Sequence, residues 1–267
     1  MPEKLNDFSP TFVIPAIEES LREYLGNYGR APQSEYEESG GLLLVNTGIP
    51  LTFFNGVSSY QLHPDQADEA IEKSVHFFQA RHATWEWKVG PQPSPPTLPE
   101  SLIKHGFEVG GDSPGMAIRL DAIDQELRMP DHLEIIAVED AVTLRTWAVT
   151  VLDGFELPDL YPGFVNLECS LGCQPFYRRY LGILRGQPVA TSALFLGEHV
   201  AGIYAVGTTP SARRLGIGAA VTQHALLEAR AEEYHIAVLQ ASQMGRGVYL
   251  WLGFQEFSTL YGYSLET

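Results

Sequence analysis

The 267-residue sequence is short of cysteine and has no long apolar segment. Cys169 and Cys173 are its only cysteines, too few for a four-ligand zinc site or a disulfide framework, and we expect both to be packing residues. No apolar run approaches the roughly 18 residues of a membrane span, and the first ten residues lack the basic and apolar regions of a secretory signal. These absences predict a cytoplasmic globular protein.

Positive charge is also scarce, because 17 Lys and Arg stand against 33 Asp and Glu, a formal net charge of −16. Nucleic acids and anionic membranes are bound through basic patches, so neither is expected as a partner. The balance is compatible with a cationic small-molecule acceptor, although an acidic surface is more often only solubilising. Whether the chain forms a homodimer stays open.

One long segment of this acidic chain, His199 to Leu227, contains no carboxylate. Within it, Val200 to Thr208 shows the alternation of a strand, and Pro210 ends that strand. Apolar residues then recur at helical spacing, at Ile217, Val221 and Ala225. The connection from strand to helix therefore lies in the part of the chain that carries no negative charge.

That connection reads Arg213-Arg214-Leu215-Gly216-Ile217-Gly218-Ala219. A helix N-terminus presents unpaired backbone N–H groups and a partial positive charge, and glycine lets a phosphate approach them closely. We interpret the turn as a pyrophosphate site; a turn whose glycines serve only tight packing is the alternative. A P-loop and a dinucleotide fingerprint do not fit, because Ala-Ala-Val follows the second glycine.

The turn resembles the acyl-CoA loop of the GNAT superfamily of N-acetyltransferases, whose pattern is Gln or Arg, two residues, Gly, one residue, and Gly or Ala. Arg213, Gly216 and Gly218 occupy those positions. The resemblance continues through Val238 to Ser242 as the next strand and Val248 to Phe254 as the following helix and its exit. It implies a CoA-dependent acyltransferase with an α/β fold built on a mixed sheet.

The chain also contains an internal repeat in the order of its predicted elements. Its first half repeats the order of its second half: helix 64–81, strand 84–89, helix 98–105 and Gly106-Phe107 match helix 216–233, strand 236–241, helix 245–252 and Gly253-Phe254. We therefore predict two tandem GNAT-like domains, residues 1–122 and 123–267, each a mostly antiparallel mixed sheet flanked by helices. Residues 121–132 are interpreted as the link between them.

The remaining elements follow from periodicity and turn signals. They are a helix around Val13 to Leu25, strands 41–46, 51–58, 115–120 and 133–138, a helix over 140–151, a meander of strands 176–184, 189–196 and 200–208, and a last strand, 255–263. Residues 152–173 are turn-rich and predict no regular element.

The first copy lacks the residues of the phosphate turn. Tyr60 to Pro64 stands where the second copy has Arg213 to Gly218, with neither glycine nor arginine, and Leu102 stands opposite Tyr249. We expect the first domain to be degenerate and only the second to bind CoA.

The resemblance also implies roles for individual residues. Backbone groups of the strand end would bind the pantetheine and the thioester oxygen, the turn would hold the pyrophosphate, and Ser242, which departs from a frequent Asn, would bond the cofactor or a water. The predicted cofactor contacts are Val206, Gly207, Thr208, Arg213, Arg214, Leu215, Gly216, Ile217, Gly218, Ala219 and Ser242.

Tyr249 matches the family's general acid, which protonates the leaving thiolate. Reference pKa values of about 10 for Tyr and about 8.5 for a thiol make that transfer uphill by roughly 1.5 units. The alternative is a tyrosine that only packs on Phe254.

The general base is not identified by the sequence. Glu198, with His199, lies in the turn before the fourth strand, where some family members carry a glutamate, although a turn carboxylate is usually only solvated. Asn55 is a candidate acceptor contact on a first-domain strand, weighed against a role in a turn or bulge. The segment with Asp153 and Glu168 borders the acceptor cleft in this family, and Trp85 and Trp87 are expected in the core.

Two functions compete on these grounds. The first is an N-acetyltransferase that uses acetyl-CoA, or another acyl-CoA, as co-substrate and a small-molecule primary amine as acceptor, without a metal. The second is a non-catalytic acyl-CoA-binding or sensing protein. A dehydrogenase-like nucleotide domain is less favoured, because the incomplete glycine pattern follows a meander.

Overall fold

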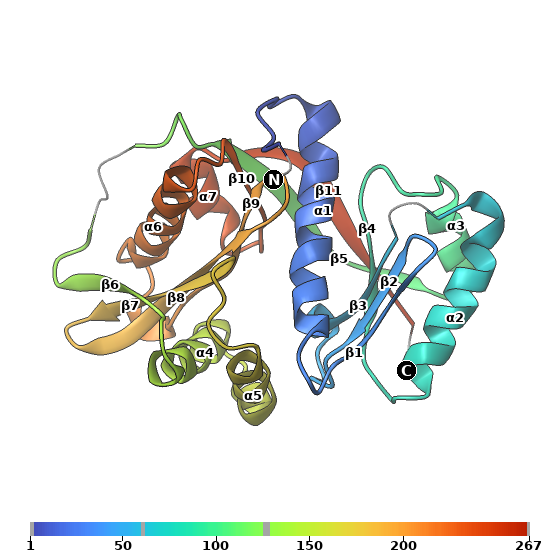
Figure 1. The fold of residues 1–267 in the computed structure, drawn as a ribbon, viewed down its shortest axis with the longest axis horizontal. Coiled ribbons are helices and arrows are strands. Elements are labelled where there is room, and N and C mark those ends of the chain that lie inside the picture. The colour runs from blue at the N-terminus through green and yellow to red at the C-terminus, as the bar shows by residue number, and fades with distance from the viewer. Residues whose placement is uncertain (1–2, 60–61, 125–128, 266–267) are drawn as a thin grey trace. The chain divides into compact units, whose positions relative to one another are not determined.

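The computed structural model describes residues 3–59, 62–124 and 129–265 (Figure 1). The chain forms two compact units. The larger unit consists of Met1–Leu21 and Gly115–Phe257, and the smaller unit of Arg22–Pro114 and Ser258–Thr267. No helix among the described residues is long and apolar enough to cross a membrane.

The larger unit is built on a mixed sheet with strand order β5-β10-β9-β8-β7-β6. Neighbouring strands are antiparallel except β9 and β10, which are parallel. The strands are β5 (Glu108–Arg119), β6 (Leu133–Ala137), β7 (Tyr177–Leu184), β8 (Gln187–Leu196), β9 (Ala201–Thr208) and β10 (Ile236–Gln240). The helices are the first part of α1 (Pro10–Gly29), α4 (Ala141–Phe155), α5 (Tyr161–Leu171), α6 (Ile217–Ala231) and α7 (Arg246–Leu252).

The smaller unit repeats this plan with the strand order β1-β2-β3-β4-β11. Here β3 and β4 are the parallel pair and the other neighbours are antiparallel. Its elements are β1 (Glu35–Ser39), β2 (Leu42–Asn46), β3 (Asn55–Ser59), α2 (Ala67–Gln79), β4 (Glu86–Val89), α3 (Leu98–Lys104) and β11 (Gln255–Ser264). A helix follows the first strand of each parallel pair and another follows the second strand, so the predicted duplication with mixed α/β sheets is confirmed.

The units exchange strands along the chain, and the predicted boundaries 1–122 and 123–267 do not describe this. Gly115–Arg119 of β5 pair with β10 in the larger unit. Tyr261–Tyr263 of β11 pair with β4 in the smaller unit. The repeat in the sequence shows the order of elements, but pairing between distant segments leaves no local pattern, so the exchange was not predicted.

Helix α6 forms because small and apolar residues recur every three or four positions along it. They are buried against the sheet: Ile217, Ala220, Val221, Ala225, Leu226 and Ala229. This packing fixes the start of α6, beside the end of β9, where the sequence predicts the phosphate turn.

Among the strands and α-helices, two were not predicted, β1 and α5. Helix α5 buries a charged residue, since Glu168 faces the core and accepts hydrogen bonds from Arg179 Nε at 2.9 Å and from the Tyr177 hydroxyl at 3.2 Å. The Glu168 and Arg179 side chains are 0% and 1% exposed. A carboxylate on the inner face obscured the apolar periodicity of this helix.

Helix α5 also corrects the prediction for the cysteines. Cys169 and Cys173 are exposed free thiols, so their assignment as packing residues is wrong. The inner face of α5 is occupied by Phe164, Val165 and Leu167 with Glu168, which leaves Cys169 on the outer face. Cys173 follows Gly172, the C-cap of the helix. Trp85 and Trp87, in contrast, are buried as predicted.

Candidate active site

The start of α6 is an uncapped helix N-terminus. Gly216 is its N-cap residue, in the left-handed conformation with φ 78°, and no side chain of the described residues caps the helix. The first turn carries no acidic residue. The N–H of Ala220 bonds the Gly216 carbonyl at 3.1 Å, which leaves the N–H groups of Ile217, Gly218 and Ala219 to a ligand or to water. Such a helix start is suited to binding an anion.

The two arginines of the turn do different things. The Arg213 guanidinium donates to the carbonyls of Thr208 at 3.2 Å and Gly154 at 2.9 Å, and it pairs with Glu156 at 2.6 Å. It therefore ties the end of β9 to the end of α4. Arg214 is exposed and has a left-handed φ of 63°. Because the described contacts occupy the Arg213 guanidinium, Arg214 is the arginine side chain that remains available to a phosphate.

Glycine at position 218 is required by close approach to the strand. A Cβ built there would lie 3.3 Å from Thr208 Oγ1, tighter than ordinary contact. On the other side of β9, a Cβ at Gly207 would lie 3.2 Å from Thr191 Oγ1 and 3.4 Å from the Phe155 ring. Small residues thus let helix and strand backbones converge at the turn.

Strands β9 and β10 separate soon after they begin to pair. Their parallel ladder consists of Ala201 opposite Ala237 and Gly202 opposite Val238. Ala205 has a left-handed φ of 48°, and the β8–β9 register shifts between Thr191 and Ala193, which marks a bulge. Beyond it, Val206 to Thr208 have no ladder partner on β10, so their backbone groups on that side can bind an extended ligand.

Tyr249 lies on α7 and is 8% exposed, in the same buried cluster as Ala225 of α6 and Leu239 of β10. Its ring packs edge-on against Phe254, with centroids 5.8 Å apart. Burial raises the pKa of Tyr249 to about 12, so the hydroxyl keeps its proton at physiological pH. Both roles weighed for this residue, packing and proton donation, are compatible with its position.

Ser242 begins the connection to α7 and has a structural task. Its hydroxyl accepts from the N–H of Gly245 at 3.1 Å, and its carbonyl accepts from the N–H of Arg246 at 3.0 Å. A Cβ on Gly245 would lie 2.9 Å from the Tyr249 ring. Ser242 and Gly245 therefore set where the Tyr249 ring lies.

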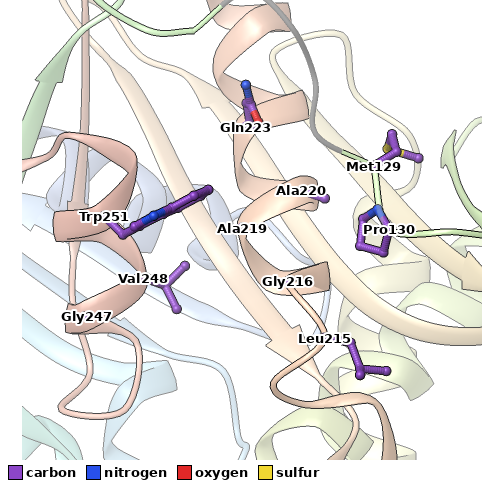
Figure 2. Close-up of a pocket in the computed structure, with 10 residues that line it drawn as sticks. All are labelled: Met129, Pro130, Leu215, Gly216, Ala219, Ala220, Gln223, Gly247, Val248 and Trp251. Atoms are coloured by element: carbon purple, nitrogen blue, oxygen red, sulfur yellow. The ribbon is translucent and has the colours of Figure 1, made fainter.

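A groove of about 560 Å³ runs over the first turns of α6 (Figure 2). Small residues form its floor, Trp251 and Val248 of α7 line one side, and Met129 and Pro130 line the other. Trp251 is 63% exposed, although it is one of the largest apolar side chains. The volume falls within the range of small-molecule sites. An apolar groove thus adjoins the uncapped start of α6.

Comparisons with known proteins agree with this geometry. Residues 180–261 match a family model described as FR47-like protein. A GCN5-related N-acetyltransferase from Kribbella flavida is similar over 96% of this chain and 96% of its own, with TM-score 0.72 and 19% identity. A tandem GNAT protein from the clavulanic acid biosynthesis pathway covers 100% of this chain and 98% of its own, with TM-score 0.63 and 13% identity. The chain has the tandem GNAT fold.

A second GCN5-related N-acetyltransferase, from Sphaerobacter thermophilus, is similar to this GNAT fold over 98% of the chain and 94% of its own, with TM-score 0.65 and 14% identity. A comparison with curated proteins gave no match.

In the smaller unit of this GNAT fold, the start of α2 is unsuited to an anion. The His63 ring accepts from the N–H of Asp65, so a side chain already caps the preceding 3-10 turn (Pro64–Gln66). Asp65, Asp68 and Glu69 lie in the first turns of this segment and repel a phosphate. Tyr60 and Gln61, part of the segment compared with the phosphate turn, lie outside the described residues.

The structure shows the surroundings of Glu198, the candidate general base, and of Asn55, the candidate acceptor contact. The Glu198 carboxylate is near Glu19 and His199, with ligand atoms of the three within 4.8 Å, at the start of β9 and before the strands part. Asn55 is 1% exposed and bonds Thr47 with its side-chain oxygen and the Ile49, Leu51 and Thr84 carbonyls with its amide. This favours the turn role for Asn55 over acceptor binding.

Sequence reasoning missed a contact between α1 and the separating strands of the GNAT fold. Ser20 Oγ and Tyr204 OH are hydrogen-bonded at 2.8 Å, and both residues are buried. Glu18 lies in the same turn of α1, and its Oε1 is buried. A signal was present, because Ile14, Glu18, Leu21 and Leu25 fall on one helical face, where a carboxylate is out of place.

Proposed function

We propose that the protein transfers an acetyl group from acetyl-CoA to a primary amine of a small molecule by direct attack. The observation that carries the proposal is the uncapped start of α6, with Gly216 in the left-handed conformation and no acid in the first turn. It adjoins a strand, β9, whose far end is unpaired toward β10. Such a pair of features suits a pyrophosphate continued by a pantetheine arm.

Different residues would bind different parts of acetyl-CoA. The N–H groups of Ile217 to Ala219 and the Arg214 guanidinium would hold the pyrophosphate. The backbone of Val206 to Thr208 would bond the pantetheine, with one N–H directed at the thioester oxygen. The groove between Trp251 and Pro130 would receive the adenosine end, which stacks on an exposed indole. Acetyl-CoA is thus a co-substrate, and no residue of this set requires a metal.

Tyr249 would assist the departure of the thiolate. With a pKa of about 12 against about 8.5 for a free thiol, complete proton transfer is uphill by roughly 3.5 units, or about 5 kcal/mol. The hydroxyl therefore acts chiefly as a hydrogen-bond donor to the sulfur as charge develops there, a form of electrostatic stabilisation. Proton transfer is completed after the C–S bond has broken.

The negative charge of the chain favours a cationic acceptor, because an ammonium ion is attracted to an acidic surface. The test is release of CoA thiol from acetyl-CoA in the presence of ethanolamine, putrescine and other small primary amines, with the product identified by mass. Amine-dependent thiol release with an acetylated product is expected. Tight binding of acetyl-CoA without turnover of any amine would favour the non-catalytic sensor instead.

A further inference from the structure

The place where β9 and β10 part has no carboxylate of its own. Strand β9 carries one ionisable residue, Tyr204, and β10 carries none. At Gly202, the last paired residue of β9, a Cβ would lie 2.6 Å from Ser20 Oγ and 2.3 Å from the Tyr204 ring. No acidic side chain fits there, so a proton acceptor at this place must come from a neighbouring element.

Helix α1 contacts both β9 and β10 beside the place where these strands part. The carbonyl of Ile17 accepts a hydrogen bond from Gln240 Nε2 at 3.2 Å, and Ser20 Oγ bonds Tyr204 OH at 2.8 Å. Gln240 and Tyr204 each lie two residues beyond the last ladder pair of their strand. The turn of α1 from Ile17 to Ser20 therefore touches both strands directly after they separate, and Glu18 lies within that turn.

Other carboxylates of the larger unit near β9 either contact other charged side chains or are exposed. Glu156 pairs with Arg213, and Glu168 pairs with Arg179. Glu19 lies near Glu198 and His199, which precede the first ladder pair of β9. Asp153 is exposed at the end of α4.

Glu18 differs from all of these. Its Oε1 is buried without a hydrogen-bond partner among the described residues. Burial raises the pKa of this carboxyl from 4.5 to about 7. A base with a pKa near the working pH is both available to accept a proton and strong enough to do so.

We propose that Glu18 is the general base of the acyl transfer, the group that deprotonates the acceptor ammonium. This rests on the proposed function. Glu18 carboxylate takes one proton from R–NH3⁺, and the free amine forms an N–C bond with the thioester carbonyl as the C–S bond breaks. The thiolate takes a proton from the Tyr249 hydroxyl. The acylated nitrogen then gives its second proton to Tyr249, which restores the hydroxyl, and Glu18 returns the first proton to solvent.

Two matched variants test this assignment with acetyl-CoA and putrescine. Glu18→Gln removes the base and keeps the shape, so kcat/KM is expected to fall about 10² to 10⁴-fold, with acetyl-CoA affinity unchanged. Glu19→Gln, one residue along the helix, keeps full activity. Equal activities of the two variants would overturn the proposal. Failure of the wild type to bind acetyl-CoA would instead refute the proposed function.

A second measurement decides the matter if putrescine is not turned over. In a carbon NMR titration of the glutamate carboxyls, the resonance that is missing from Glu18→Gln should titrate near pH 7 in the wild type. It should also shift when putrescine is added to the CoA-saturated protein. Titration at the ordinary value of about 4.3, or no response to putrescine, would overturn the assignment.

Discussion

Tyr249 is the residue whose chemistry separates a transferase from a CoA-binding protein. Tyr249→Phe keeps the ring and its contact with Phe254 and removes the donor. In the proposed mechanism the hydroxyl acts mainly by hydrogen bonding to the sulfur, so kcat should fall about 10²-fold, near the lower end for general acids, with acetyl-CoA affinity unchanged. Steady-state kinetics at saturating substrates measures this.

Tyr180→Phe is the matched control, since Tyr180 belongs to the same buried cluster and its hydroxyl is also buried. It should leave kcat unchanged. A fully active Tyr249→Phe enzyme would show that water or another group protonates the thiolate.

Glu18 also makes a prediction about stability. Its pKa is raised on folding, from 4.5 to about 7, so the folded state binds this proton more tightly than the unfolded state. The resulting stabilisation is complete below pH 4.5 and is lost as the pH rises through about 7. Glu18→Gln should therefore change little at pH 4 and raise the free energy of unfolding at pH 8 by about 1 to 3 kcal/mol.

Denaturant unfolding of the wild type, Glu18→Gln and Glu19→Gln at both pH values checks this. Equal stabilities of the wild type and Glu18→Gln at pH 8 would contradict a half-buried carboxylate with a raised pKa at this position.

At the residue scale, the sequence could predict positions defined by a local pattern. Gly216 and Tyr249 have fixed spacings from a helix start and a helix end, and both were placed correctly on their elements. Whether Arg213 points at a phosphate could not be predicted, because its partner Glu156 lies on α4, far away in sequence. The partial burial of Glu18 likewise depends on packing that only the folded chain shows.

In the proposed function, acetyl-CoA binding depends on the start of α6. Gly216→Val should weaken acetyl-CoA binding by about tenfold or more, because a β-branched residue resists φ 78° and the N–H groups would no longer converge. Gly186→Val is the control. Gly186 also has a positive φ, 80°, but lies in the turn between β7 and β8, with no atom within 4 Å of an added Cβ.

Calorimetry on both variants separates strain from recognition. Gly186→Val should retain wild-type affinity. If Gly216→Val also bound acetyl-CoA with wild-type affinity, the glycines of the turn would serve packing and not binding.

Helices and strands could be predicted where a single physical cause, such as burial of one face, produced a regular pattern in the sequence. The meander and the helix–strand–helix order followed from alternation, helical spacing and glycine or proline stops. Helix α5 was missed because Glu168 is buried by a pair with Arg179 on β7, which no local pattern announces. Strand β1 was missed because four of its five residues are exposed, so it shows no apolar alternation.

At the scale of the whole molecule, one architecture occurs twice, and among the described residues one copy has the features that suit an anion. The larger unit has an uncapped, acid-free helix start with glycines, whereas the smaller unit has His63 and Asp65 at the corresponding place. The duplication was visible in the sequence, since it preserves the order of elements. The exchange of β5 and β11 was not, because only the pairing in space defines it.

The most direct test of this account is a calorimetric titration of the wild-type chain with acetyl-CoA. The predicted result is saturable binding with one acetyl-CoA per chain, because among the described residues the uncapped glycine turn belongs to the larger unit. Two equivalent sites per chain, or no binding at all, would contradict it.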